Sequence, residues 1–223
     1  RFRWNMKSPM PLAEAEAVAS DFIAKVRDWI SKYEVAGSIR RRKEIVGDVE
    51  ILVRPEFATA PQANLFGEST GMGKNMLTWR MLELLHVGII EEGERAKDGR
   101  RAPFSDRHFM FKFMDKPIDL YAVFPPADWF PTLVIRTGCA DFSHFLVTHS
   151  QAVGVFFRDG HMEKDGKILQ INSEPEVFEL SGIKYIEPSD RGDNWLQHMH
   201  ETADYLKATV LKGYLKKPET LSS

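Results

Sequence analysis

Two acidic residues alternate with apolar residues in a short β-branched segment, residues 48–53 (DVEILV). Side chains two residues apart on a strand point to the same face, so Asp48 and Glu50 are expected to project together. Neighbouring carboxylates repel each other, and one of them takes up a proton unless a cation lies beside them. The segment therefore predicts a strand that carries either an exposed acidic face or a site for divalent cations.

Gly37 and Ser38 precede this acidic pair, and Arg40 and Arg41 follow them within residues 37–50 (GSIRRRKEIVGDVE). Glycine lets a phosphate approach the backbone, serine adds a short donor, and arginine offers a forked donor to phosphate oxygens. Taken singly, a Gly-Ser pair is a plain turn and a basic run is a solvated loop. Beside the two acids, the same residues predict a phosphate-binding turn.

A third acid, Asp119, lies within the apolar residues 117–121 (PIDLY). An unpaired charge in such a strand would cost several kcal/mol. Ligation of a cation together with Asp48 and Glu50 would remove that cost. Oxygen ligands suit Mg²⁺ or Mn²⁺, and shared carboxylates can bridge two such ions about 4 Å apart. We therefore expect these three acids to form a two-ion site.

Hydrophobic periodicity predicts both helices and strands in the first half of the chain. Apolar residues at helical spacing favour helices over residues 12–30 and 75–86. Other runs are rich in β-branched and aromatic residues. The segments that predict strands are residues 48–53, 89–94, 108–113 and 118–124.

The pair Pro125-Pro126 marks an expected boundary between two subdomains, residues 1–125 and residues 126–223. The elements expected after it are a helix over 141–149, two strands within 154–169, a short helix opened by a capping box at 173–176, and a last helix from about Asp193. The predicted fold class is α+β, with a mixed sheet flanked by helices and then a small α/β subdomain.

The spacing of these residues resembles the nucleotidyltransferase superfamily. Its mark is an apolar residue followed by Gly and Ser, then acid–apolar–acid, and a third acid on a later strand. The matching residues here are Ala36-Gly37-Ser38, Asp48-Val49-Glu50 and Asp119. Residues 37–52 (GSIRRRKEIVGDVEIL) are similar to the X-family DNA polymerases.

The second half of the chain supports this resemblance. Residues 136–138 (RTG) resemble the Phe-Thr-Gly turn of the nucleotide-selecting subdomain, and residues 182–191 resemble the closing segment of the family. The likeness covers roughly residues 10–192 and implies a palm-like catalytic subdomain followed by a thumb-like one. It also implies a minimal core without the amino-terminal lyase domain of the repair members.

The resemblance implies roles for particular residues. Asp48, Glu50 and Asp119 would ligate two Mg²⁺ or Mn²⁺ ions, and Asp119 would serve the ion that activates the primer 3′-hydroxyl. The residues implied at the nucleotide are Gly37, Ser38, Arg41, Gly47, Thr137 and Gly138. Among them, Ser38, Arg41 and the backbone N–H of Gly47 would hold the triphosphate, and the last two would line the sugar pocket. The implied partners are a nucleoside triphosphate and a primer–template or gapped DNA, with the protein acting as a monomer in repair-type gap filling.

Three departures from the family pattern affect the expected function. Glu50 stands where the polymerases usually have Asp, and Ile135-Arg136 replaces an aromatic pair. The positions of an Asn and an Arg that touch nucleotide and template fall on Ser143 and Val147. These departures leave open a template-independent transferase that acts on RNA, protein or a small molecule. A non-catalytic DNA-binding accessory protein is a further alternative, although a protein that had lost its catalytic activity should have lost the three acids first.

Composition and charge set further limits. The net charge of −2 is low for a protein that binds duplex DNA, so phosphate contacts must be local. The basic clusters are residues 40–43 and the set Arg95, Lys97, Arg100 and Arg101. The single Cys139 excludes an internal disulfide, and no apolar run is long enough to cross a bilayer. We expect a cytoplasmic protein, acting in the host cell if its source is a virus or phage.

Overall fold

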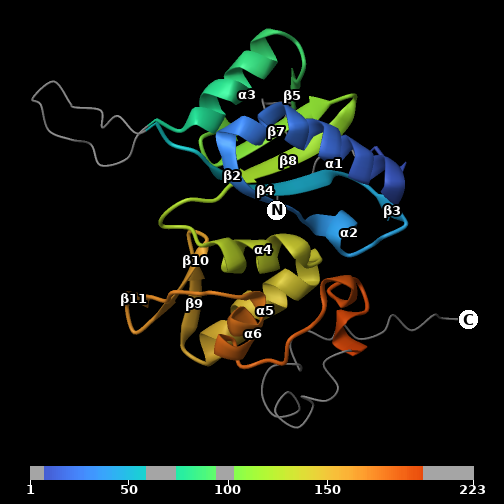
Figure 1. Cartoon of the computed structure of the whole chain (residues 1–223). Helices are drawn as coiled ribbons and strands as arrows, with labels where there is room; N and C mark the ends of the chain where they lie inside the picture. The colour runs from blue at the N-terminus through green and yellow to red at the C-terminus, as the bar shows by residue number, and fades with distance from the viewer. Residues whose placement is uncertain (1–7, 59–73, 94–102, 198–223) are drawn as a thin grey trace, which may run out of the picture.

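The computed structural model describes residues 8–58, 74–93 and 103–197. The chain forms two lobes, of which the first runs from blue to green and the second from yellow to red (Figure 1). The predicted basic cluster at Arg95 to Arg101 and most of the last predicted helix lie outside the described residues. Within the described part, no helix is both long and apolar enough to cross a membrane.

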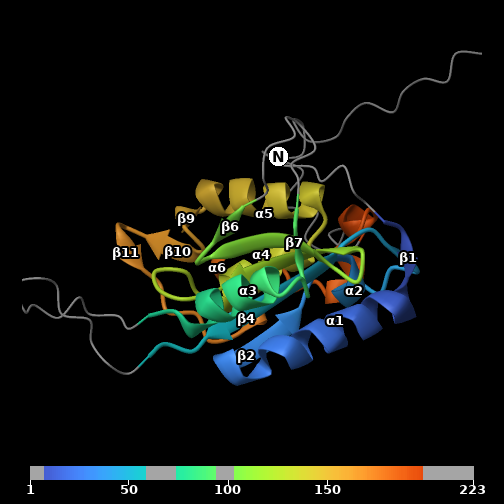
Figure 2. The ribbon, with the colours of Figure 1, turned by 90° about the horizontal axis from the view of Figure 1, so that it is seen from above.

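A six-stranded mixed sheet forms the centre of the first lobe. In sheet order its strands are β2 (Ile30–Val35), β4 (Val49–Pro55), β8 (Lys116–Ala122), β7 (His108–Phe113) and β5 (Glu91–Glu92), with β6 (Phe104–Ser105) paired to β7. Only the β4–β8 pair is parallel, and the other pairs are antiparallel. Figure 2 shows this sheet from above, with α1 beside β2 and β4. The predicted strand at residues 48–53 is thus a central strand.

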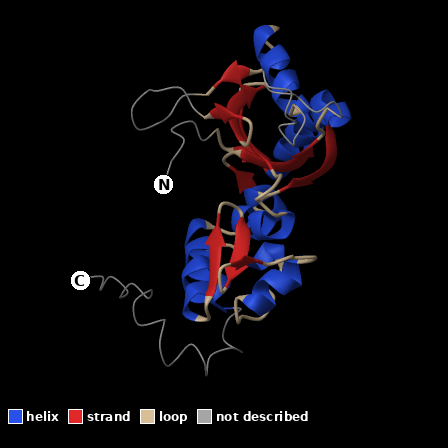
Figure 3. Ribbon diagram, turned by 90° about the vertical axis from the view of Figure 1, so that its left-hand side faces the viewer, coloured by secondary structure: helices blue, strands red, loops and turns tan. Residues whose placement is uncertain are grey.

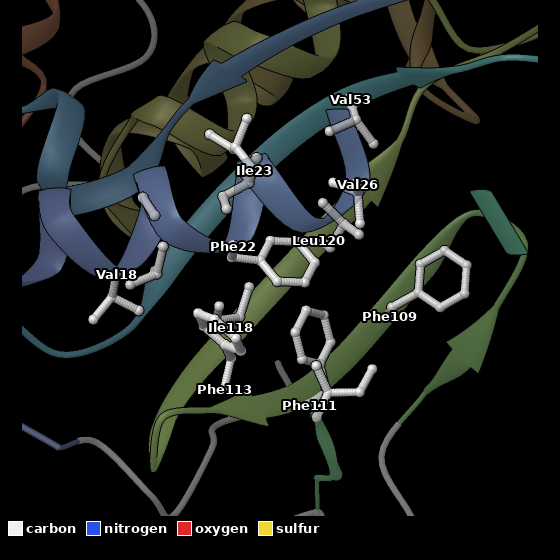
Figure 4. Packing of buried hydrophobic residues seen from close by; sticks show 14 of the residues in the cluster. Val18, Phe22, Ile23, Val26, Val53, Phe109, Phe111, Phe113, Ile118 and Leu120 are labelled. Carbon is white, nitrogen blue, oxygen red and sulfur yellow. The ribbon is translucent and has the colours of Figure 1, made fainter. Parts of the chain in front are cut away.

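Helices α1 (Leu12–Val26) and α3 (Met76–His86) cover one face of this sheet. Alternate residues of β4, β7 and β8 meet them in the main hydrophobic cluster (Figure 4). Phe22 of α1 packs against Phe111 and Phe113, with ring centroids 4.9 and 5.6 Å apart. Since successive strand residues point to opposite faces, Glu50 and Asp119 face away from this cluster and toward the second lobe.

The second lobe packs helices α4 (Trp129–Thr137), α5 (Ala140–Ala152) and α6 (Glu174–Leu180) beside a small antiparallel sheet. The strands of that sheet are β9 (Val155–Arg158), β10 (His161–Lys164) and β11 (Lys167–Ile168). The two lobes and their separate sheets are distinct in Figure 3. A third hydrophobic cluster joins Leu52 and Tyr121 of the large sheet to Trp129 and Leu133 of α4. Helix α4 therefore covers part of the face that carries the acids.

The mixed α and β composition is as predicted, but several elements differ. The helix predicted over 12–30 ends at Val26, a 3₁₀ turn η1 (Arg27–Trp29) follows, and Ile30 begins β2. The last strand of the large sheet starts at Lys116, because the preceding two residues of the hairpin take positive φ. The predicted strand over 89–94 contains only the short β5.

Side chains at the predicted starts of α3 and α6 cap these helices, although only the cap of α6 was itself predicted. Asn75 caps α3 by accepting from the backbone N–H groups of Leu77 and Thr78. Ser173 caps α6 and accepts from the N–H of Glu176 at 3.4 Å. The Glu176 carboxylate reaches back to the N–H of Asn172, one residue before the cap. The capping box at 173–176 therefore forms with its second bond displaced by one residue.

Helix α4 was not predicted from the sequence. Its first turn contains Pro131, and Asp128 caps it by accepting from the N–H of Trp129 at 2.6 Å. Proline is acceptable early in a helix because the first N–H groups have no intrahelical partner. As a result, Thr137 ends a helix and Gly138 caps it, where the sequence predicted a turn.

Candidate functional site

Two of the three predicted acids lie side by side on parallel strands. Glu50 of β4 is the register partner of Asp119 of β8. Asp48, partly buried, precedes β4 by one residue. All three come together because the sheet places β8, a strand from much later in the chain, directly against β4.

The three carboxylates influence one another strongly. Burial, together with repulsion from Asp48 and Asp119, raises the pKa of Glu50 to about 8, although Arg136 and Arg41 oppose the shift. Without a cation, Glu50 therefore holds a proton at neutral pH. A divalent ion beside the carboxylates would reverse this balance, since it stabilises their ionised forms.

Gly37 lies directly against the Glu50 carboxylate. It begins the short helix α2 (Gly37–Arg40) with a φ of 59°, in the left-handed region that favours glycine. A Cβ placed on it would lie 1.9 Å from Glu50 Oε2. The N–H of Ala36 also donates to the Glu50 carbonyl at 2.8 Å. The Gly-Ser turn is therefore fixed against the acidic strand, as its position in the sequence suggested.

Two polar atoms on this turn are buried without a hydrogen-bond partner in the described part of the chain: Ser38 Oγ and Arg41 Nε. Buried donors without partners are rare in folded proteins, because each costs about 1–3 kcal/mol. A ligand or ordered water that bonds to them would remove this cost. Gly47, the third predicted phosphate contact, is partly buried in the turn before β4.

Both carboxylate oxygens of Asp119 have protein partners. His108 Nε2 contacts Asp119 Oδ1. The hydroxyl of Tyr121 donates to Asp119 Oδ2 at 2.9 Å. Burial raises the pKa of Tyr121, so this hydroxyl keeps its proton and acts as the donor. Asp119 is thus buried, but its partners are His108 and Tyr121, which the sequence analysis did not identify.

Tyr121 is itself enclosed between two side chains. The His108 ring stacks on it at a centroid distance of 4.5 Å and an interplanar angle of 11°. On the ring, the guanidinium carbon of Arg136 lies 3.8 Å from the centroid, and Arg136 Nη1 donates to the hydroxyl at 3.0 Å. Strand alternation could have placed Tyr121 on the same face as Asp119. Nothing in the sequence indicated that Arg136 of α4 would meet it.

The basic cluster at residues 40–43 is engaged within the protein. Arg40 binds Thr137 Oγ1 at 3.0 Å, and Arg41 Nη1 donates to the Thr137 carbonyl. Arg42 pairs with Glu16 of α1. Lys43 pairs with Asp193 at 2.8 Å. In this form of the protein the cluster joins the two lobes, and only part of it remains accessible to a ligand.

Glu174 is the centre of the connection between the lobes. It accepts two bonds from Arg40, at 2.8 and 2.7 Å, and one from the fully buried Arg191, at 2.8 Å. Burial alone would raise the pKa of Glu174, but the bonds from the two arginines lower it below its usual range. A charged network of this kind is strongly destabilised when one member is removed.

Thr137 and Gly138 adjoin this connection. Thr137 is fully buried, and both of its oxygens accept bonds from the basic cluster. A Cβ on Gly138 would lie 2.2 Å from Cδ1 of Phe142 and 2.8 Å from Oγ of Ser143, so close packing requires glycine there. Ser143 donates to the Ile135 carbonyl at 2.8 Å. Thr137 and Gly138 lie near Arg40 and Arg41, and their role at a sugar remains a prediction.

Cys139, which follows Gly138, caps α5 by accepting from the N–H of Phe142.

Across the described ranges, no group of three or more His, Cys, Asp or Glu side chains is arranged to hold a metal ion.

Comparison with known proteins identifies no family for this chain. No family model matches the sequence, and no curated protein matches it significantly.

Proposed function

We propose that this protein is a nucleotidyltransferase that joins a nucleotide from a nucleoside triphosphate to a 3′-hydroxyl with the help of two divalent cations. In its most specific form, the proposal is an X-family type of DNA polymerase that acts on short gaps or primer ends. The observation that carries it is the pairing of Glu50 with Asp119 on parallel strands, with Asp48 close enough to help raise the pKa of Glu50 to about 8. Without a cation, repulsion within such a cluster of carboxylates destabilises the folded protein.

The chemistry of the donors fits Mg²⁺ or Mn²⁺. Carboxylate oxygens are the ligands that these ions prefer. Asp48, Glu50 and Asp119 would hold them after their side chains move, since among the described residues no three such groups are already arranged around a metal position. When bound, the ions supply charge stabilisation for the attacking and leaving oxygens of an in-line displacement. Both oxygens of Asp119 are now engaged, so ligation requires Asp119 to share or release its contact with His108 or Tyr121.

The remaining roles belong to the turn against the acidic strand. Ser38 Oγ and Arg41 Nε are buried donors without partners, and phosphate oxygens would provide acceptors for both. Gly37 permits the close approach of this turn to Glu50. Once released from one donor, Asp119 has a free oxygen that can take the proton of the 3′-hydroxyl. Beyond these contacts, nucleotidyl transfer requires little from the protein except positioning of the reactants and electrostatic stabilisation of the transition state.

A primer-extension assay tests the proposal. The arms are primer alone and primer with template, each with deoxynucleotides and with ribonucleotides, in Mg²⁺ and in Mn²⁺. Asp119→Asn should abolish extension in every arm, whereas the matched control Asp21→Asn, on the exposed side of α1, should extend as the parent protein does. Extension that survives in Asp119→Asn, or no transfer to any acceptor, would contradict the proposal.

A template-independent transferase is the second candidate. Its support is the state of Ser143, whose hydroxyl is bonded to the Ile135 carbonyl in its own lobe, at a position where the polymerases use an Asn to contact the nucleotide. Equal extension with and without template would favour this candidate over the polymerase.

A further inference from the structure

Arg136 reaches the carboxylate cluster from the second lobe. It lies on α4, while Asp119 and Tyr121 lie on β8 of the first lobe. Arg136 Nη1 donates to the Tyr121 hydroxyl at 3.0 Å, and that hydroxyl donates to Asp119 Oδ2 at 2.9 Å. Hydrogen bonds in such a series polarise one another. The Arg136 guanidinium is therefore connected to Asp119, an acid of the proposed metal site, through the neutral hydroxyl of Tyr121.

The charge of Arg136 also acts on Glu50. Glu50 is the register partner of Asp119, so the guanidinium that reaches Asp119 through Tyr121 also lies near the Glu50 carboxylate, and the two charges attract each other. Within the described residues, no carboxylate lies at ion-pair distance from Arg136, whose hydrogen-bond partner is the neutral Tyr121 hydroxyl. Among the described residues its positive charge therefore has no direct carboxylate partner, which leaves it to act on Glu50 and Asp119.

We infer that Arg136 is a positioning residue that serves as an internal counter-ion for Glu50 and Asp119, so that divalent cations bind the cluster against its charge. The inference rests on the proposed function, because it takes these acids to be the metal site. A unit charge held near a divalent cation in a partly buried site repels it enough to change affinity by about tenfold. Removal of the charge should therefore strengthen cation binding.

A different role for Arg136 would give the opposite result. If the arginine served only to orient Tyr121 and thereby Asp119, its loss would loosen a ligand. Loss of such supporting contacts weakens metal affinity by about 10–100-fold. The sign of the change in affinity therefore separates a counter-ion from an orienting residue.

The test measures Mn²⁺ binding to the full chain by electron paramagnetic resonance of the free ion, without nucleotide or DNA. Arg136→Met removes the charge and every hydrogen-bond donor, whereas Arg136→Gln removes the charge and shortens the side chain but keeps an amide donor. Both should bind Mn²⁺ about tenfold more tightly than the parent protein. Arg136→Lys, which keeps the charge, should bind as the parent does. The control Arg158→Met removes an exposed arginine of β9 and should leave affinity unchanged.

Equal or weaker binding by both neutral variants would overturn the inference. Circular dichroism must show that each variant is folded, and if Arg136→Met is not, Arg136→Gln carries the same test. The double variant Asp48→Asn/Glu50→Gln separates this failure from that of the proposed function. If the parent protein binds Mn²⁺ no better than this double variant, the metal site is wrong and the inference falls with it. If the parent binds well and only the Arg136 variants fail to differ, the metal site stands and the counter-ion role is wrong.

Discussion

The carboxylate of Glu50 packs against Gly37, so closely that a methyl group on the glycine would lie 1.9 Å from Glu50 Oε2. Gly37 also has a φ of 59°, which side chains disfavour. The first residue of the predicted phosphate turn and the middle acid of the predicted metal site are therefore fixed to each other. A substitution at either residue should therefore disturb the position of the other.

Gly37→Ala should lower the free energy of unfolding by about 2–4 kcal/mol, since left-handed strain adds to overpacking against Glu50. Gly88→Ala is the matched control, because Gly88 has a φ of 72° but no atom within 4 Å of an added Cβ. Gly88→Ala should cost only about 1–2 kcal/mol of strain. Urea denaturation of both variants measures the difference. Equal losses would mean that Glu50 moves aside without cost.

The folded protein should tolerate the loss of the Asp119 charge but not the loss of its acceptor oxygens. In EDTA, Asp119→Asn should be as stable as the parent protein or more stable, because the Asp119 charge no longer helps to force Glu50 into its protonated form while an acceptor for Tyr121 remains. Asp119→Ala should be less stable by about 1–3 kcal/mol, because the buried Tyr121 hydroxyl loses its acceptor. Thermal melts in EDTA compare the two variants. An alanine variant as stable as the asparagine variant would show that water replaces the lost acceptor.

The raised pKa of Glu50 predicts how stability depends on pH. An unfolded glutamate loses its proton near pH 4.5, whereas folded Glu50 keeps its proton to about pH 8. Between these values the folded protein binds more protons, so without metal the free energy of unfolding falls as pH rises. The total loss is about 5 kcal/mol, and Glu50→Gln should remove it. Urea titrations in EDTA across this range test the slope, and an unchanged slope in Glu50→Gln would assign it to other groups.

Glu174 should show the opposite pH dependence. Its bonds to Arg40 and Arg191 lower its pKa, so its contribution is present above the ordinary carboxyl pKa and is lost as pH falls through the folded value. Glu174→Gln should destabilise the protein by about 3–5 kcal/mol at pH 7, because two arginines lose their charged partner. The control Glu179→Gln, at an exposed position of the same helix, should change stability little. A small effect at Glu174 would mean that the lobes are joined mainly by apolar contacts.

Much of the acidic site was predictable because it depends on local rules. The strand pattern correctly placed Glu50 on the central strand β4, with Asp48 directly before it. The cost of a buried charge indicated that Asp119 would have a partner, although the partner predicted was a cation and those observed are His108 and Tyr121. The pairing of Glu50 with Asp119 follows from β8 lying parallel to β4, a long-range choice that no local pattern encodes.

The contacts between the lobes were less predictable for the same reason. The basic run at residues 40–43 reads as a phosphate site or a solvated loop until α6 brings Glu174 to Arg40. The stack of His108, Tyr121 and Arg136 draws on three separate elements. Helix α4 was missed because its apolar and aromatic residues and its early proline gave no clear helical signal.

DNA binding provides the last test, because Arg42 and Lys43 are exposed but paired with carboxylates. Arg42 bonds to Glu16, and Lys43 to Asp193. If DNA passes this surface, its phosphates must compete with these partners. Each additional phosphate neutralised steepens the log–log dependence of affinity on salt by about 0.9.

Glu16→Gln and Asp193→Asn should therefore each tighten DNA binding at low salt and steepen the salt slope by up to about 0.9. The control Glu83→Gln releases Arg80 on α3 in the same way, but away from the acidic face. Fluorescence anisotropy with a labelled primer–template over several salt concentrations measures all three variants. If Glu83→Gln alone strengthens binding, DNA follows α3 rather than the basic cluster. If no variant changes the slope, these pairs are too weak to compete with phosphate, as exposed ion pairs often are.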